Sequence, residues 1–415
     1  MRYNPRVSIM KKILVPLVVL LLAATASAEN LVLMNGTIID GTLKARFAGS
    51  IRIRDGKITD IGVVKPAPGE ATLDVKGMIV APGFVDLQNH SAVALDKDHG
   101  AATQVAQGIT TALLGADGTG PYSVEQFMAR FDDRAAALNI ATLVGHATVR
   151  RQIMGADYKR AATPDEISRM ALLIEDGMRE GAFGVSSDLT SEPASYSTND
   201  ELRVLATSAA KYGGFFAVRL RDESAKAMES VAELVELGRA TKVRVQITHP
   251  RTHAMAVLTA IDKARMEGVD ISADTSPYDD DASPETEKEL RAYLQHPWVM
   301  IASDGGMDTK HPRSAGTFPR ALGYYAREQK VIPLERAIRK MTGLPAARIG
   351  FKERGTLFKG AVADIVVFDP LKVRDQSTAD NPFAASVGIR HVFVNGTMVV
   401  KDGEVTAERP GVALR

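Results

Sequence analysis

The sequence contains no cysteine. The protein therefore has no disulfides and no lipid-modified cysteine, and any metal site in it must use histidine and carboxylate ligands. An excess of charge of one sign is also missing, because 51 Lys and Arg stand against 50 Asp and Glu. Without a basic field on its surface, the protein is not expected to bind nucleic acid.

Long hydrophobic runs are missing too, except at the N-terminus. There a basic stretch at residues 2–12 precedes the apolar run Ile13–Ala24 and then Ala26-Ser27-Ala28, the pattern of a secretory signal. The alternative, an uncleaved membrane anchor, is disfavoured because the run is shorter than the roughly 20 residues of a span. We expect residues 1–28 to be a signal peptide cleaved after Ala28. The mature protein would be soluble, secreted or periplasmic, and not bound to a membrane.

The rest of the chain alternates β-rich apolar runs with helical stretches. Its 415 residues suffice for one (β/α)₈ barrel of about 250 residues and a smaller module. The apolar runs are Met78–Leu87, Gly108–Gly115, Ile140–His146, Gly181–Ser187, Gly214–Arg221, Val243–His249, Val269–Pro277 and Trp298–Ser303. Eight such units predict an α/β protein with a TIM-like parallel barrel over residues 78–354.

Both flanks of this region have hairpin signals. Asn35-Gly36 and Asp55-Gly56 separate short strand-like runs near the N-terminus, and Asn395-Gly396 and Asp402-Gly403 do so near the C-terminus. Neither flank alone has enough strands for its own core, which argues against two independent tails. We therefore predict that residues 29–77 and 355–415 form one small β-sandwich.

A helix start is also readable in the barrel region. Thr163-Pro164-Asp165-Glu166 has the pattern of a capping box with proline at the first helical position. Ile167, Met170, Ile174 and Met178 follow at helical spacing and are predicted to face the core rather than a cofactor.

Polar residues follow the predicted strands. After the apolar residues up to Val85, the chain changes to Asp86, Gln88 and His90, which share one face because alternate strand residues point the same way. The ends of the other runs carry Asp117, His146, Asp188, Arg219, His249, Tyr278 and Asp304. In a parallel barrel these ends meet on one face, where we predict the active site.

Several stretches also carry a family resemblance. They are Gly108-Ile109-Thr110-Thr111, Leu143-Val144-Gly145-His146, Val245-Gln246-Ile247-Thr248-His249, Ala302-Ser303-Asp304-Gly305 and residues 311–320. Together they resemble the amidohydrolase superfamily, most closely its N-acyl-D-amino-acid deacylase (D-aminoacylase) branch, over nearly the whole mature chain.

This resemblance implies zinc-dependent hydrolysis of a small N-acyl amino acid or a related amide. In that scheme the metal lowers the pKa of bound water, and a catalytic aspartate, here Asp304, accepts its proton and passes it to the leaving amine. The implied ligands of zinc, or of another divalent metal, are His90, Asp117, His249 and Asp304. Asp117 stands where many members have cysteine, and a carboxylate is an acceptable ligand.

Two ligand positions are substituted. Histidines are expected where this chain has Gln88, a poor ligand, and Arg219, which only donates hydrogen bonds. A guanidinium about 5 Å from Zn²⁺ would cost roughly 6–7 kcal/mol at an effective dielectric of 20. Either Arg219 swings out and a single ion binds weakly, or Arg219 replaces the metal's charge and pairs with Asp117 or Asp304.

Substrate contacts are implied by the resemblance at Arg251, which would hold the carboxylate, with Tyr278 and Tyr196 nearby. The segment between Tyr278 and Trp298 is short, which predicts an open mouth. Its Asp279-Asp280-Asp281 run is more typical of a solvated loop than of a cation site. His146 is left out of the metal shell because it is equally consistent with a structural role.

Two functions remain open from the sequence. His90, Asp117, His249 and Asp304 favour a metal-dependent amidohydrolase that acts on N-acyl-D-amino acids. Gln88 and Arg219 favour the alternative, a protein of the same fold that has lost its metal and only binds acylated ligands. The retained Asp304 beside two histidines leads us to prefer the enzyme.

Overall fold

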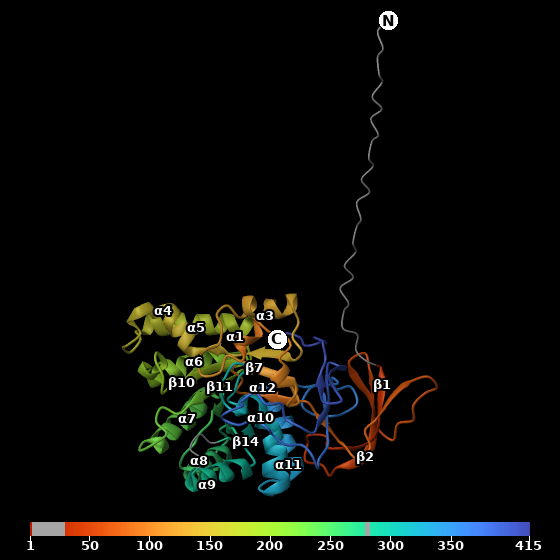
Figure 1. The fold of residues 1–415 in the computed structure, drawn as a ribbon. Helices are drawn as coiled ribbons and strands as arrows, with labels where there is room; N and C mark the ends of the chain where they lie inside the picture. The colour runs from red at the N-terminus through yellow and green to blue at the C-terminus, as the bar shows by residue number, and fades with distance from the viewer. Residues whose placement is uncertain (2–29, 279–282) are drawn as a thin grey trace.

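The computed structural model describes Met1 and residues 30–278 and 283–415 (Figure 1). The predicted signal peptide after Met1, including its cleavage point, lies outside the described residues, as does the Asp279–Asp281 run. Within the described ranges, no helix combines the length and the apolar character that crossing a bilayer requires.

The two ends of the chain pair in one nine-stranded sheet. Its strand order is β18-β17-β16-β15-β5-β1-β2-β3, and β4 pairs with β1. The strands are β1 (Leu31–Ile38), β2 (Phe47–Arg54), β3 (Lys57–Gly62), β4 (Ala71–Asp74), β5 (Ile79–Pro82), β15 (Ile365–Phe368), β16 (Ile389–Val394), β17 (Thr397–Lys401) and β18 (Glu404–Val405). Leu33, Ile51 and Phe393 share one buried apolar cluster. The N-terminal and C-terminal segments therefore bury their apolar faces together.

The sequence predicted a single strand over Met78–Leu87, and this was wrong. The segment divides at Gly83: β5 pairs with β1 and β15 of the terminal sheet, and β6 (Phe84–Asp86) pairs with β7. A Cβ at Gly83 would lie 2.2 Å from Thr110, so only glycine fits where the chain passes between the sheets. The terminal sheet thus extends to Pro82, beyond the predicted boundary at residue 77.

The remaining strands form two parallel sheets, in the orders β6-β7-β8 and β14-β13-β12-β11-β10-β9. The strands not yet given are β7 (Ile109–Leu114), β8 (Asn139–Thr142), β9 (Val144–Gly145), β10 (Gly184–Asp188), β11 (Phe215–Arg219), β12 (Arg244–Ile247), β13 (Ile271–Thr275) and β14 (Val299–Ile301). Only Leu143 separates β8 from β9. Asn89, after β6, forms an isolated parallel bridge with Gly305, after β14, so the segments that follow these two strands meet.

Helices follow most of these strands and pack around them, with the terminal sheet to one side (Figure 1). They are α1 (Ala92–Leu95), α2 (Ala102–Val105), α3 (Val124–Asp133), α4 (His146–Met154), η1 (Gly155–Asp157), α5 (Pro164–Arg179), η2 (Ala194–Tyr196), α6 (Asn199–Lys211), α7 (Ala227–Thr241), α8 (Ala254–Met266), α9 (Pro284–Gln295), α10 (Arg313–Arg320), η3 (Ala321–Glu328), α11 (Leu334–Met341) and α12 (Gly343–Ile349).

Helix α5 begins as the sequence predicted. Thr163 is its N-cap, the capping box with Glu166 is formed, and Pro164 opens the helix. The predicted core residues Ile167, Met170, Ile174 and Met178 are all buried. Local sequence was sufficient here because capping and periodicity act within a few turns.

Candidate active site

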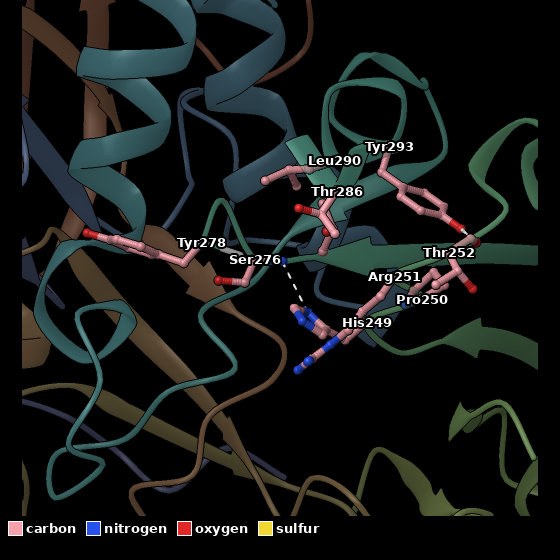
Figure 2. A pocket seen from close by; sticks show the side chains of 10 residues that line it. His249, Pro250, Arg251, Thr252, Ser276, Tyr278, Thr286, Leu290 and Tyr293 are labelled. Atoms are coloured by element: carbon pink, nitrogen blue, oxygen red, sulfur yellow. Dashed lines mark hydrogen bonds between the residues drawn. The ribbon is translucent and has the colours of Figure 1, made fainter. Parts of the chain in front are cut away.

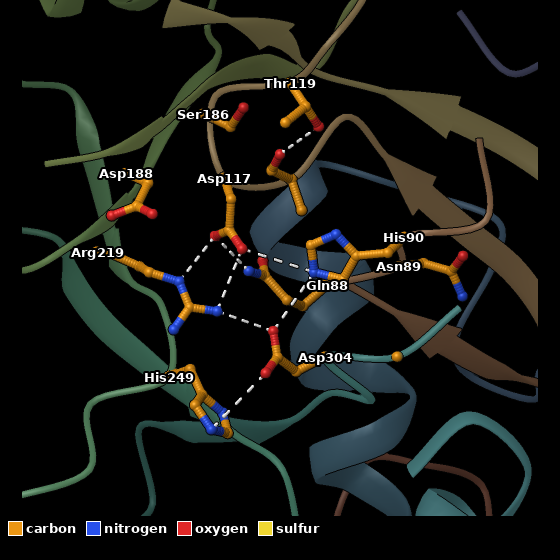
Figure 3. Close-up of polar contacts among 12 residues, drawn as sticks. Gln88, Asn89, His90, Asp117, Thr119, Ser186, Asp188, Arg219, His249 and Asp304 are labelled. Atoms are coloured by element: carbon orange, nitrogen blue, oxygen red, sulfur yellow. Dashed lines mark hydrogen bonds and ion pairs between the residues drawn. The ribbon is translucent and has the colours of Figure 1, made fainter. Parts of the chain in front are cut away.

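The predicted site residues lie at one end of the parallel strands. Asp117 follows β7, Arg219 ends β11, His249 follows β12 and Asp304 follows β14, while His90 follows β6 (Figure 3). Asp117, His249 and Asp304 all have left-handed backbone, with φ of 53°, 48° and 51°. Such strained conformations of residues other than glycine concentrate at functional sites. The shared geometry turns these side chains toward one another.

Arg219 lies between the two carboxylates. Its Nε donates to Asp117 Oδ1 at 3.1 Å and its Nη2 donates to Asp117 Oδ2 at 3.2 Å. The same Nη2 donates to Asp304 Oδ1 at 2.9 Å. Gln88, which is 1% exposed, adds a hydrogen bond from Nε2 to Asp117 Oδ1 at 2.8 Å. The sequence left open whether Arg219 swings out or pairs with a carboxylate. In the structure Arg219 stays inside the centre and pairs with both carboxylates.

Asp304 is surrounded by cationic and imidazole groups. Arg313 Nη1 donates to its Oδ2, His90 Nε2 lies 3.4 Å from Oδ1, and His249 Nε2 lies 3.8 Å from Oδ2. Burial alone would raise the pKa of Asp304, but His249, the hydrogen bond from His90, and the charges of Arg219 and Arg313 together lower that pKa far below its usual value. Asp304 is therefore ionised at neutral pH.

His249 is a neutral, oriented histidine. Burial lowers its pKa to about 4. The backbone N–H of Ser276 donates to Nδ1 at 3.3 Å, so the single ring proton is on Nε2, the atom that faces Asp304. The backbone N–H of His249 is in turn held by Asp274 Oδ1 at 3.1 Å. In this tautomer the nitrogen nearest the centre is a donor and not a metal ligand.

A divalent metal does not fit this arrangement. Ligand atoms of His90, Asp117 and Asp304 do lie within 4.8 Å of one another, which is the spacing that a metal cluster needs. Each oxygen of the two carboxylates, however, already accepts a hydrogen bond from an arginine. The two negative charges are also balanced by the two guanidinium charges, so an added divalent ion would find no net negative charge to attract it.

Arg313 was not predicted, and Asp86 has another role than its strand-end position indicated. Arg313 comes from α10, and only its place in the family-like stretch 311–320 could have suggested it. Asp86 shares the strand-end pattern but does not join the centre: it accepts hydrogen bonds from the backbone N–H and hydroxyl of Ser303, at 2.9 and 2.6 Å. Because Ser303 precedes Asp304, this fully buried carboxylate positions Asp304.

A pocket of about 270 Å³ adjoins the centre (Figure 2). It is lined by His249, Pro250, Arg251, Thr252, Thr275, Ser276, Tyr278, Thr286, Leu290 and Tyr293. His249 thus belongs to both the pocket and the charged centre. Exposed Arg251 lies on the pocket wall, in reach of an anionic group bound there.

The predicted tyrosines are placed differently from Arg251. Tyr278 lines the pocket, but its hydroxyl points away from His249 and donates to Asp375 at 2.7 Å (Figure 2). Tyr196 donates to Glu192 at 3.0 Å and does not line the pocket.

His146 is held outside the centre. Its Nδ1 lies 2.8 Å from the hydroxyl of Ser187, and its Nε2 lies 2.8 Å from Glu201 Oε1. Arg150 pairs with the other oxygen of Glu201, and all of these side chains are buried. The group braces α4 against α6, the structural role that the sequence had left open.

Comparisons with known proteins agree with this fold. Residues 231–400 match a family model described as amidohydrolase family. A D-aminoacylase from Alcaligenes xylosoxydans xylosoxydans is 31% identical over 471 residues, which cover 93% of this chain and 97% of that protein. The chain therefore belongs to the amidohydrolase family. It is a hydrolase of carbon–nitrogen bonds.

Within that family, it belongs to the N-acyl-D-amino-acid deacylase branch. A crystal structure of D-aminoacylase superposes with a TM-score of 0.86 at 29% identity and covers 93% of this chain and all of that chain. An N-acyl-D-glutamate deacylase from Bordetella bronchiseptica, complexed with zinc and a phosphonate mimic of the tetrahedral intermediate, gives 0.87 at 31% identity, with 94% and 100% covered. This N-acyl-D-glutamate deacylase is thus a relative that binds zinc.

Proposed function

We propose that the protein hydrolyses the amide bond of N-acyl-D-amino acids, or of closely related small amides, at the pocket beside Asp304. The observation that carries the proposal is the contact between the centre and the pocket. His249 lies 3.8 Å from Asp304 and also lines the pocket, so a ligand there is next to an ionised carboxylate. Membership of the deacylase branch supports this choice of substrate.

In this proposal each residue has a stated task. Arg251 pairs with the substrate carboxylate at the pocket wall, and the apolar groups of Leu290 and Tyr293 contact its hydrocarbon part. Asp304 accepts a proton from the attacking water and returns it to the leaving nitrogen. Neutral His249 turns its Nε2–H toward that carboxylate from a distance of 3.8 Å. Because its contacts lower the pKa of Asp304, it is a weaker base than a free carboxylate.

The zinc or other divalent ion that the resemblance implied does not enter these steps. Its implied ligands His90, Asp117, His249 and Asp304 are all near the centre, but the carboxylate oxygens are used by Arg219 and Arg313. The substrate is a small molecule, and neither nucleic acid nor a membrane is a proposed partner.

The proposal includes a closed barrel, a β-sandwich and an exported location. The closed barrel is supported by the bridge between Asn89 and Gly305 and by the short gap between β8 and β9. The sandwich is supported by the shared cluster of Leu33, Ile51 and Phe393. Export to the periplasm or medium rests on the basic, apolar and Ala-Ser-Ala sequence of residues 2–28.

One observation favours a second candidate, a protein that binds acylated ligands without hydrolysing them. Asp304 accepts hydrogen bonds from two arginines, which stabilise the carboxylate and oppose its protonation. A base that cannot gain a proton cannot assist the reaction. The pocket would then retain only its binding role.

Purified mature protein should be tested against N-acetyl-D-methionine, N-acetyl-D-glutamate and N-acetyl-D-aspartate, with the L-enantiomers as matched controls. Release of the free D-amino acid supports hydrolysis. The same compounds should be titrated calorimetrically. Binding without release at any metal concentration selects the second candidate, and neither binding nor release contradicts both.

A further inference from the structure

Arg219 occupies the middle of the charged centre rather than its edge. Its guanidinium spans Asp117 and Asp304, which follow strands β7 and β14, through three hydrogen bonds of 2.9–3.2 Å (Figure 3). The side chain is 15% exposed, and the two carboxylates are 18% and 6% exposed. A cation that is this enclosed, with two anions bonded to the same Nη2, has surroundings like those of a bound metal ion.

Gln88 completes the same pattern. Both Gln88 and Arg219 stand where the family resemblance expects metal-binding histidines, and both donate hydrogen bonds to Asp117. Each substitution alone would weaken a metal site, but together they supply hydrogen bonds to a half-buried carboxylate that would otherwise have unused lone pairs. The two residues therefore form one arrangement for holding Asp117 without an ion.

We propose that the Arg219 guanidinium is the permanent cation of this centre and excludes a divalent metal from it. The centre is closed by Gln88 and Arg313, which donate to Asp117 and Asp304. This inference concerns what holds the carboxylates together, and it stands whether or not the pocket hydrolyses amides. It separates this chain from relatives that bind zinc.

The first test is metal content. Full-length protein should be expressed in zinc-supplemented medium, purified without chelator, dialysed, and analysed by mass spectrometry for bound metals. We expect far less than one ion per chain, and no rise in melting temperature when zinc is added. Stoichiometric zinc in the wild type would overturn the proposal. This test needs no substituted protein, so it holds even if a variant fails to fold.

The second test restores the ligands. The Gln88→His, Arg219→His double variant removes the guanidinium and adds two imidazoles, and zinc affinity in calorimetry should rise by at least about 10³-fold. Arg221→His is the matched control: Arg221 lies two residues away but pairs with Glu233 at 2.9 Å, so this histidine should add no affinity.

These two tests measure metal binding and not amide hydrolysis, so their failure can be distinguished from failure of the proposed function. A folded double variant with wild-type zinc affinity would contradict the inference, since removal of Arg219 would not have opened a site. An equal gain in Arg221→His would also contradict it, because any added histidine would then suffice.

Discussion

Arg219 Nη2 lies 2.9 Å from Asp304 Oδ1 while it also contacts Asp117, so a single side chain joins residues that are far apart in the sequence. Asp304 thereby has a fixed position and a fixed charge. The same contact that orients the proposed base also lowers its pKa. The contacts that hold Asp304 in position therefore also make it a weaker base.

Asp304→Asn should abolish amide hydrolysis. The amide keeps the shape of the side chain but cannot accept the proton of water, so we expect a loss of kcat of at least about 10²-fold, the usual scale of general-base catalysis. Asp262→Asn, on the exposed face of α8, is the matched control and should retain full activity. Equal turnover by wild type and Asp304→Asn would show that Asp304 has another role.

The stability of Asp304→Asn should also fall. It leaves Arg219 and Arg313 buried without a common anion, and breaking a buried ion pair on one side costs about 3–5 kcal/mol. Urea unfolding at pH 7 measures this free energy. Because the folded pKa of Asp304 is lowered, its contribution is complete above about pH 4 and is lost as the pH falls further. The gap between wild type and variant should therefore narrow in acid.

Lys340 should give the protein a stability that rises with pH. Burial lowers the pKa of this lysine to about 7, and its ammonium group contacts the carbonyls of His296 and Val299. Between pH 7 and about 9.5 the unfolded chain binds this proton and the folded protein does not, so the free energy of unfolding should increase by up to about 1.4 kcal/mol per pH unit. Lys340→Met should flatten that slope. A slope identical to wild type would contradict the assignment.

Truncation after Gly355 should destabilise the whole protein. It removes β15 to β18, and with them one of the two partners of β5 and the buried residues Ile365 and Phe393 of the terminal cluster. We expect a lower melting temperature and increased binding of a hydrophobic dye. A soluble fragment with the wild-type melting curve would mean that the N-terminal strands do not depend on the C-terminal segment.

The mature protein should begin at Glu29. The Ala26-Ser27-Ala28 sequence after the apolar run has the small residues that a signal peptidase requires. The intact mass of protein recovered from the periplasm or medium measures this directly. A mass that still includes Ile13–Ala24 would exclude cleavage and restore the anchor alternative.

Much of this architecture could be predicted because its causes are local. The alternation of apolar runs and helices gave the parallel strands, and the Thr163 capping box gave the start of α5. The positions of His90, Asp117, His249 and Asp304 at strand ends followed from strand direction alone.

Contacts between distant segments could not be predicted. Arg313 reaches Asp304 from α10, and the hydroxyl of Tyr278 is bound to Asp375 in the C-terminal segment, which removes it from the pocket. The sequence did not predict that Met78–Leu87 is divided at Gly83 into β5 and β6, because both halves of this segment are apolar. Only their partners, β15 for one and β7 for the other, distinguish them.

Gly83 also links the terminal sheet to the chemistry of the site. Its backbone N–H donates to Asp364 O, just before β15, at 2.9 Å, while the next N–H, of Phe84, donates to Gly108 O beside β7 at 2.9 Å. Because consecutive amides are held by different sheets and Thr110 leaves no room for a side chain, β6 cannot slide along its neighbours. The terminal sheet thereby fixes how far Gln88 and His90 project into the centre.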